Sequence, residues 1–337
     1  MKNLGLLNKF IFIINSLFAV LLLLSYTIPH IKPAYLPLVS AMSLMVPILL
    51  FINNLFLIYW LILIKKQFLL SFFCLLLGFN YATSFYKLSS KATSNNPQTS
   101  VMSYNVRLFN LYSWIKDKNT AHKLDAFIKK EKPDILCLQE YYTDTSVEHL
   151  YPYKYLYFKD TTRKNGQAIF SNFKIINKGS LNFEKTSNNA IFADIIKNKD
   201  TIRIYNIHLE SMHLNPKKDS VTKKNSERLL KSIANTFKKQ QAQIELINQD
   251  LAANPYKTII CADLNNTAFS WAYRRLKSDF KDAFVEAGSG FGTTFNYNYI
   301  PLRIDFILTD RQFEVLSFKK YNVKYSDHNP IKTTLNF

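Results

Sequence analysis

The first hundred residues carry no aspartate or glutamate, and three long apolar runs occupy most of them. About 20 apolar residues in a row are enough for a helix to cross a bilayer. Buried helices of a soluble domain rarely follow one another without one acidic side chain, so the pattern predicts a transmembrane region of three helices. The runs cover residues 10–26, 35–64 and 68–86.

A cleaved signal peptide is the alternative interpretation of the first run, because Lys2 and Lys9 precede it. Two observations oppose this interpretation. No small-residue cleavage site follows the run, and two further apolar runs come directly after it. The sequence therefore favours an uncleaved helix.

The lysines between the runs predict the orientation, because positive loops tend to stay in the cytoplasm. We expect a multi-pass protein of the bacterial cytoplasmic (inner) membrane, with a cytoplasmic N-terminus and everything after residue 86 on the periplasmic side. This prediction inverts if the third run does not span. The first group of lysines is Lys2, Lys9, Lys65 and Lys66, and the opposite group is Lys32, Lys87 and Lys91.

Residues 89–100, "SSKATSNNPQTS", are small and polar, which is typical of a linker. The predicted division is therefore an anchor at 1–88, a linker at 89–100 and a catalytic domain at 101–337. Basic side chains outnumber acidic ones, 43 to 24. This surplus fits a polyanionic partner such as nucleic acid or anionic lipid headgroups, and it fits equally a surface of solvated lysines. The three cysteines show no tight spacing and are interpreted as buried thiols.

Short apolar strands recur after residue 100, with helical patterns at 121–130 and 226–253. Strands mixed with helices in this way indicate an α/β domain with mixed sheets. The strands are expected at 101–106, 135–139, 168–171, 191–195, 202–208, 258–262, 304–308 and 331–335.

Six of these strand regions carry a carboxylate, an amide or an imidazole at or near an end. Taken singly, each residue has an ordinary explanation as a turn former, a surface charge or a helix cap. Taken together, they supply the metal ligands, base, acid and orienting donors needed to attack a phosphate ester. The residues are Asn105, Glu140, His208, Asp263 with Asn265, Asp305, and Asp327 with His328.

Oxygen ligands suit magnesium better than zinc, and Glu140 with Asp327 or Asp263 offers such ligands. The segment 288–295, "GSGFGTTF", is expected to form a mobile loop near the site. It lacks the Gly-Lys-Ser/Thr ending of a phosphate-binding P-loop.

The order of these motifs resembles the endonuclease/exonuclease/phosphatase family of metal-dependent phosphodiesterases, which includes DNase I. The resemblance covers about residues 100–337, and the anchored arrangement is similar to bacterial members with three N-terminal helices. The motifs, in family order, are "SYNVR", "DILCLQE", "GQAIFSN", "YNIHLES", "CADLNN", "RIDFIL" and "SDHNP".

The resemblance implies a DNase I-like fold, a four-layer α/β/β/α sandwich with the site at one end of the strands. It also implies a Mg²⁺ cofactor, for which Mn²⁺ is a possible substitute. Glu140 is the implied principal metal ligand, and Asn105 and Asp327 complete the implied metal site.

The implied catalytic residues are His208, Asp263, Asn265, Asp305, Asp327 and His328. Asp327 would orient His328, Asp305 would support a histidine, and His208 would lie near the leaving oxygen. Asn265 would orient the nucleophile or the phosphate. Asp263 and His328 both remain candidates for the general base.

The predicted function is a Mg²⁺-dependent hydrolase of phosphate esters, of the phosphodiesterase or nuclease type, tethered to the lipid bilayer by its N-terminal helices. Its substrate is either nucleic acid or a phospholipid headgroup; the second choice would make it a phospholipid or phosphoinositide-type phosphatase or phosphodiesterase. A non-catalytic envelope binding protein is the third alternative. No protein partner is inferred.

Overall fold

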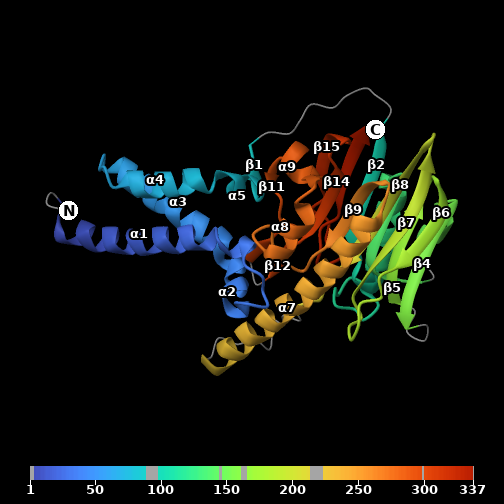
Figure 1. Cartoon of the computed structure of the whole chain (residues 1–337), viewed down its shortest axis with the longest axis horizontal. Coiled ribbons are helices and arrows are strands. Elements are labelled where there is room, and N and C mark those ends of the chain that lie inside the picture. The colour runs from blue at the N-terminus through green and yellow to red at the C-terminus, as the bar shows by residue number, and fades with distance from the viewer. Residues whose placement is uncertain are drawn as a thin grey trace.

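Two packed β-sheets form the centre of the C-terminal part of the molecule, and a bundle of helices projects from one side (Figure 1). The computed structural model describes residues 4–88, 98–143, 146–160, 165–212, 223–297 and 300–336. Within these residues each main sheet has six strands.

The first sheet has the strand order β10-β14-β9-β8-β7-β6. Strands β8 and β9 run parallel and the other neighbours are antiparallel. The sheet is therefore mixed, as the sequence predicts. Its strands are β6 (Lys174–Ser180), β7 (Asn189–Lys197), β8 (Asp200–His208), β9 (Lys257–Asp263), β10 (Phe280–Asp282) and β14 (Asp305–Asp310).

The second sheet has the order β15-β16-β2-β3-β5-β4, with β2 and β3 as its parallel pair. Its strands are β2 (Thr99–Asn105), β3 (Ile135–Tyr142), β4 (Tyr153–Asp160), β5 (Asn165–Ser171), β15 (Glu314–Lys320) and β16 (Ile331–Asn336). Two short ribbons complete the strands: β1 (Tyr86–Lys87) with β11 (Gly290–Phe291), and β12 (Phe295–Tyr297) with β13 (Ile300–Leu302).

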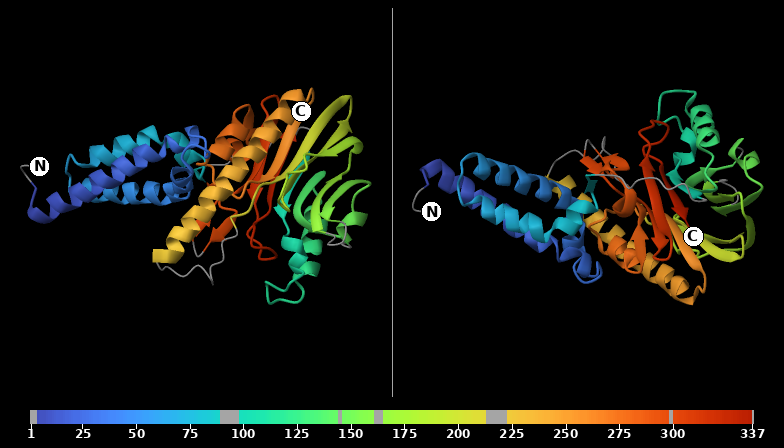
Figure 2. Two further views of the ribbon diagram at one scale, coloured as in Figure 1. Left: turned by 60° about the horizontal axis from the view of Figure 1, so that its bottom comes forward. Right: turned by 90° about the horizontal axis from the view of Figure 1, so that it is seen from above.

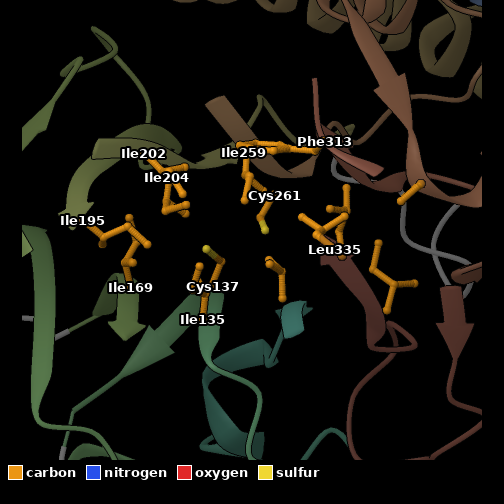
Figure 3. Close-up of a cluster of buried hydrophobic side chains, with 14 of the residues drawn as sticks. Ile135, Cys137, Ile169, Ile195, Ile202, Ile204, Ile259, Cys261, Phe313 and Leu335 are labelled. Carbon is orange, nitrogen blue, oxygen red and sulfur yellow. The ribbon is translucent and has the colours of Figure 1, made fainter. Parts of the chain in front are cut away.

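The hydrophobic core between the sheets follows from the two-residue period of the strands (Figure 3). Ile259 and Cys261 of β9 point into this core, whereas Ile260 and Ala262 point out toward helices. A strand buried on both faces needs an apolar run of this kind. Cys137 enters the same core from the second sheet, and the three cysteines are buried free thiols, as predicted.

Helices cover the outer face of each sheet and complete the four layers. The long helix α7 (Lys223–Ala253) and α8 (Trp271–Lys277) pack against the first sheet through a second apolar cluster. Helix α6 (Thr120–Glu131) packs against the second sheet. The predicted α/β/β/α sandwich is confirmed. The remaining short helices are η3 (Arg107–Asn110), η4 (Ser146–His149) and α9 (Ala283–Ala287).

The N-terminal helices extend away from the sheets, with residue 4 at the far end of the bundle (Figure 2). Among the described residues, two helical stretches, Leu6–His30 and Pro37–Ile62, are long and apolar enough to cross a membrane. The helices and 3₁₀ turns are α1 (Leu6–Ser25), η1 (Ile28–His30), α2 (Pro37–Ala41), η2 (Met42–Met45), α3 (Val46–Ile62), α4 (Phe68–Leu77) and α5 (Phe79–Thr83).

The prediction of a third long apolar helix at 68–86 is wrong. This run forms two short helices, α4 and α5, which meet at Gly78. The Tyr26 side chain packs so close to Gly78 that an added Cβ would lie 1.9 Å from the tyrosine oxygen. Glycine is therefore required here, and its low helix propensity favours the break.

Buried polar side chains of the bundle form hydrogen bonds between its helices. Asn15 of α1 donates to Ser71 Oγ of α4 at 2.8 Å and accepts from Trp60 Nε1 of α3 at 2.9 Å. Asn53 donates to the Phe18 carbonyl at 3.2 Å. An unpaired polar group in an apolar environment costs several kcal/mol, so these contacts hold the three helices in one register.

The bundle and the sandwich share buried contacts. Arg303 Nη1 donates to the Ser84 carbonyl at 2.8 Å, and the ring of Phe269, 1% exposed, lies 6.3 Å from that of Tyr81. We call this contact region the seam. Strand β11, in the predicted glycine-rich loop 288–295, pairs with β1 of the seam, and Gly292 N donates to the Phe85 carbonyl. The loop is thus anchored by these contacts. Most of the predicted linker, residues 89–97, lies outside the described residues, and the domain boundaries stay a prediction.

Candidate active site

Three neighbouring strands of the first sheet bring His208, Asp263 and Asp305 side by side. Asp263 on β9 is the central residue. It is the register partner of His208 across the parallel pair β8/β9 and of Asp305 across the antiparallel pair β9/β14. All three lie in phase with inward-facing residues such as Ile204, Cys261 and Ile307. They therefore close the core at one end, where the two sheets meet.

The second sheet contributes Asn105 at the end of β2. Its amide nitrogen donates to Asp263 Oδ2 at 2.9 Å and to Glu140 Oε1 at 3.2 Å. One neutral side chain thus bridges carboxylates from both sheets. Asn105 is 1% exposed, which makes these bonds hard to replace by water.

Glu140 reaches this amide because β3 is irregular at that point. Simple alternation would turn Glu140 outward, since Leu136 and Leu138 face the outer layer. The pairing of β3 with β5 shifts register between Leu138 and Tyr141, and Glu140 has φ +48°. A bulge of this kind re-aims a side chain, and it delivers the carboxylate to the site.

Asp305 holds the histidine of the last motif. His328 Nδ1 lies 3.0 Å from Asp305 Oδ2, and its Nε2 lies 3.8 Å from Asp263 Oδ2. Burial lowers the pKa of His328, but the carboxylates of Asp305 and Asp263 outweigh burial and hold the pKa well above its usual value. Burial also raises the pKa of Asp263, against the opposing charge of His328. The group is a buried carboxylate–imidazole–carboxylate row.

Asp327 lies elsewhere than expected. The sequence predicts that Asp327 orients His328, but Asp305 makes that contact. Asp327 Oδ2 instead lies 3.1 Å from Arg107 Nη1, and the Arg107 guanidinium stacks 4.6 Å above the Trp114 ring. The Asp327 side chain is about a third exposed, so it lies at the rim of the site and not beside the His328 imidazole.

His208 has a ring nitrogen without a partner. Its Nε2 is buried and makes no hydrogen bond, although Asp263 Oδ2 is 3.6 Å away and Glu140 Oε1 is 3.9 Å away. A pocket of about 520 Å³ opens beside this nitrogen. The pocket is lined mostly by polar residues: Glu140, Tyr157, Lys159, Asn165, Gln167, Thr186, Ser187, Asn188, Asn189, His208 and Ser211, with Leu108 and Gly166.

Asn265 follows Asp263 in a tight turn with φ +46°, a conformation that asparagine tolerates. Its backbone N–H donates to Asp263 Oδ1 at 2.9 Å, and its amide donates to the Leu209 carbonyl at 3.0 Å. These bonds fix the Asp263 carboxylate from the side opposite Asn105.

Three residues that contact the candidate site residues were not predicted from the sequence. Ser326 Oγ donates to the Asn105 carbonyl at 2.8 Å and accepts from His328 N at 3.2 Å, so it joins two motifs. Thr294 Oγ1 accepts from Asp305 N at 3.1 Å. The Phe295 ring lies 5.0 Å from that of His328. Ser326 stands inside the quoted motif "SDHNP", and Thr294 and Phe295 lie in the segment 288–295 that is expected near the site, but no pattern marks these three side chains individually.

The donor set fits a hard cation. Glu140 is about a third exposed, and of its two oxygens only Oε1 is held by Asn105. Glu140, Asp263, Asp305 and Asp327 gather four carboxylates around one end of the core. His328 and Arg107 offset part of this negative charge, and a bound cation would offset more of it. In the part of the chain that is described, Asp263, Asp305 and His328 also have potential ligand atoms within 4.8 Å of one another. Carboxylate oxygens are the ligands that Mg²⁺ and Mn²⁺ prefer.

Glu210 takes no part in this arrangement. It is 5% exposed and binds Lys239 Nζ at 2.7 Å, which makes it a structural residue of the contact with α7. His213 lies outside the described residues.

Two family models match the chain. The model described as the Endonuclease/Exonuclease/phosphatase family matches residues 102–328, and a model described only as a domain of unknown function matches residues 8–85. No curated protein matches the chain significantly.

Solved structures share the fold at low identity. The human Nocturnin catalytic domain with bound sulfate is 18% identical, with a TM-score of 0.55 over 73% of this chain and 96% of that chain. A humanised D. rerio TDP2 is 17% identical, with a TM-score of 0.55 over 71% and 99%. A Bacteroides vulgatus endonuclease/exonuclease/phosphatase is 18% identical, with a TM-score of 0.55 over 72% and 99%. The chain therefore belongs to the Endonuclease/Exonuclease/phosphatase family and is a hydrolase of phosphate esters.

Proposed function

We propose that the protein is a membrane-tethered phosphodiester hydrolase that requires a divalent cation, with Mg²⁺ as its usual metal. The observation that supports this most is the convergence of five motifs on one buried cluster, next to a polar pocket. Such a cluster contains a base, charge-stabilising groups and an imidazole nitrogen without a partner, which are groups that phosphate-ester hydrolysis can use.

His328 and Asp263 divide the proton chemistry in this proposal. His328 keeps its proton because Asp305 and Asp263 raise its pKa, so its Nε2–H is suited to stabilise a charged phosphoryl oxygen. Asp263 has a raised pKa, which makes its carboxylate a better acceptor for a proton from the attacking water. His208 Nε2, which has no partner, is placed to serve the leaving oxygen.

Glu140 would hold the cation, with Asn105 beside it and Asp327 at the rim. When bound, the cation supplies charge neutralisation to the phosphoryl group. Asn105 and Asn265 keep the Asp263 carboxylate turned toward the same space, through bonds of 2.9 Å to each oxygen.

The tethering proposal rests on the surface of the bundle. Its outward side chains are large and apolar, such as Phe10, Ile13, Phe51 and Ile58, each more than half exposed. A surface of this kind needs lipid around it. Helix α1 also carries Asn15, the centre of the bundle's polar contacts, which favours retention of α1 over removal as a signal peptide.

The test is hydrolysis of bis(p-nitrophenyl) phosphate by the full chain in detergent, with Mg²⁺ and with excess chelator. We expect Mg²⁺-dependent turnover that falls about 100-fold or more in Glu140→Gln and in His328→Ala, because each removes a charge-stabilising group from the site.

Matched controls are Glu286→Gln and His122→Ala, which change the same residue types at exposed positions of α9 and α6. Wild-type turnover in either site variant would refute the site, and turnover that persists in chelator would refute the metal requirement. A panel of single-stranded DNA, RNA and phospholipid, assayed with the same variants, then identifies the substrate class.

A further inference from the structure

Two hollows lie where the base of the helical bundle meets α8, and Arg274 lines both of them. The larger, about 570 Å³, and the smaller, about 430 Å³, share Pro29, Arg274 and Ser278 in their walls. In both, one wall belongs to the bundle (Pro29, His30, Asn80, Tyr81, Thr83, Ser84) and the other to the sandwich. We call the two together the junction groove.

The junction groove is cationic. Arg274, Arg275, Lys277 and Arg311 line it, and no acidic residue lines it among the residues that the structure describes. Those four side chains form no ion pair with any described residue, although Arg311 donates to the Ser278 carbonyl at 2.9 Å. Arg303 nearby is different, because Asp282 neutralises it at 2.5 Å. The charge of the groove is thus uncompensated within the described chain.

The groove lies at the end of the apolar surface of the bundle. Leu76, Leu77 and Phe79, each more than half exposed, come directly before the groove residues Asn80 and Tyr81. The rings of Tyr26 and Tyr81 stack there at 4.9 Å, and tyrosines gather at the level of lipid headgroups. An apolar surface therefore changes to a cationic one at this end of the bundle, the change that a boundary between lipid tails and phosphates would require.

The chemistry of the groove selects its ligand. Arginine guanidinium groups bind phosphate oxygens through paired hydrogen bonds, and lysine adds a point charge. The larger hollow also has apolar walls from Ala268, Phe280 and Val285, which suit the glycerol and first acyl carbons of a lipid. The groove is a short, half-open hollow between two parts of the chain, so its size fits a single headgroup better than the extended backbone of a nucleic acid.

We propose that the junction groove binds the phosphate headgroup of an anionic glycerophospholipid and fixes the sandwich against the bilayer. This proposal rests on the proposed tethering. It assigns the exposed arginines of α8 a role separate from hydrolysis. Ala272 and Leu276 form the buried side of α8 that packs against the first sheet, whereas Arg274 and Arg275 are on the exposed side.

The experiment titrates the full chain, in a neutral detergent, with fluorescent phosphatidylglycerol and with fluorescent phosphatidylcholine. The double variant Arg274→Gln/Lys277→Gln is compared with Lys129→Gln/Lys130→Gln, which removes the same charge from the exposed side of α6. Thermal unfolding checks that both variants fold.

We expect the α8 variant to bind phosphatidylglycerol about tenfold more weakly or worse, because each basic residue near a lipid surface contributes to binding. The α6 variant should bind it like the wild type. Equal binding by both variants, or equal affinity for phosphatidylcholine and phosphatidylglycerol, would overturn the proposal. Displacement of the lipid by millimolar glycerol phosphate would overturn it in favour of a site for soluble phosphate. The readout is binding, so failure of the hydrolysis test leaves this result interpretable.

Discussion

The backbone conformation at Glu140 decides whether its carboxylate reaches the site. A non-glycine residue with φ near +50° in a strand is strained, at a cost of about 1 to 3 kcal/mol. Here the strain accompanies the bulge that turns the carboxylate from the outer layer into the site. The sequence "DILCLQE" shows a carboxylate at a strand end, but it does not show that the chain turns there.

The convergence of the candidate site residues could be predicted from the sequence, because their motifs end apolar strands that meet at one edge. The hydrogen-bond partners of these residues could not be predicted, and their catalytic roles stay a prediction. Asp305 and Asp327 are both acids near His328 in motif order, and only the register of β14 against β9 brings Asp305 to the imidazole. Thr294 acts through a single hydroxyl on a backbone N–H, which leaves no pattern in the sequence.

Glu131 allows a test of how one ionised side chain contributes to the stability of the fold. Its pKa lies below the usual 4.5: burial raises it, but hydrogen bonds from Tyr321 and Lys332 outweigh burial. A carboxylate with a lowered pKa stabilises the fold above its unfolded pKa, and this contribution is lost as pH falls through the folded pKa. We expect Glu131→Gln to cost about 1 to 2 kcal/mol at pH 7 and much less near pH 3.

The measurement is denaturant unfolding of the full chain in detergent at both pH values. Asp117→Asn is the control, because the Asp117–Lys123 pair is exposed and should matter little. An equal loss of stability at both pH values would show that Glu131 acts through packing and not through its charge.

At the scale of elements, the two sheets are joined by amides as well as by apolar packing. Gln139 of β3 donates to Asn206 Oδ1 of β8 at 2.7 Å, and Asn206 Nδ2 donates to the carbonyls of Leu138 and Ala168. All these groups are buried, directly below the site. The bonds hold the two sheets at a fixed spacing, and the spacing sets the distance between Asn105 and Asp263.

Asn206→Ala should therefore destabilise the sandwich by about 2 to 4 kcal/mol, because it leaves buried donors and acceptors without partners. Asn296→Ala, at an exposed position of β12, should change stability by less than about 0.5 kcal/mol. Both are measured by thermal unfolding. A loss for Asn206→Ala no larger than that of the control would show that water replaces the amide.

The elements with continuous apolar runs were predicted, and those without them were missed. Strand β9 is buried on both faces, and its apolar run predicts a strand. The edge strand β6 is largely exposed and carries Lys174, Asn177 and Lys178. An edge strand needs few apolar residues, so its sequence resembles a loop. At residues 68–86 the sequence predicts a long helix that the structure does not contain. The composition of this run is apolar enough for a span, but Gly78 divides it into two short helices.

At the scale of the whole molecule, the path of the bundle predicts its orientation. Although the run 68–86 forms no single long helix, α4 and α5 together pass along α1. Ser71 lies beside Asn15 and Tyr81 beside Tyr26, so α4 and α5 run in the direction of α1 and lead to the sandwich. The N-terminus and Lys65–Lys66 then share one end of the bundle, and the sandwich lies at the other. Positive residues at the first end favour the cytoplasm there.

Alkaline phosphatase fused at the C-terminus should therefore be active in intact bacteria, because that enzyme works only outside the cytoplasm. The same reporter fused after Ile64 should be inactive. The reverse pattern would place the sandwich in the cytoplasm.

The seam has a consequence for biosynthesis. Arg303 is 219 residues beyond Ser84, and Phe269 follows Tyr81 by a similar length of chain. The helices are synthesised first, but Ser84 and Tyr81 can make these contacts only after Arg303 and Phe269 have emerged from the ribosome. Contacts between such distant segments form slowly, and apolar surface exposed in the interval promotes aggregation. A bilayer that shelters the bundle while the rest of the chain is translated would protect the aromatic side of the seam until Phe269 arrives.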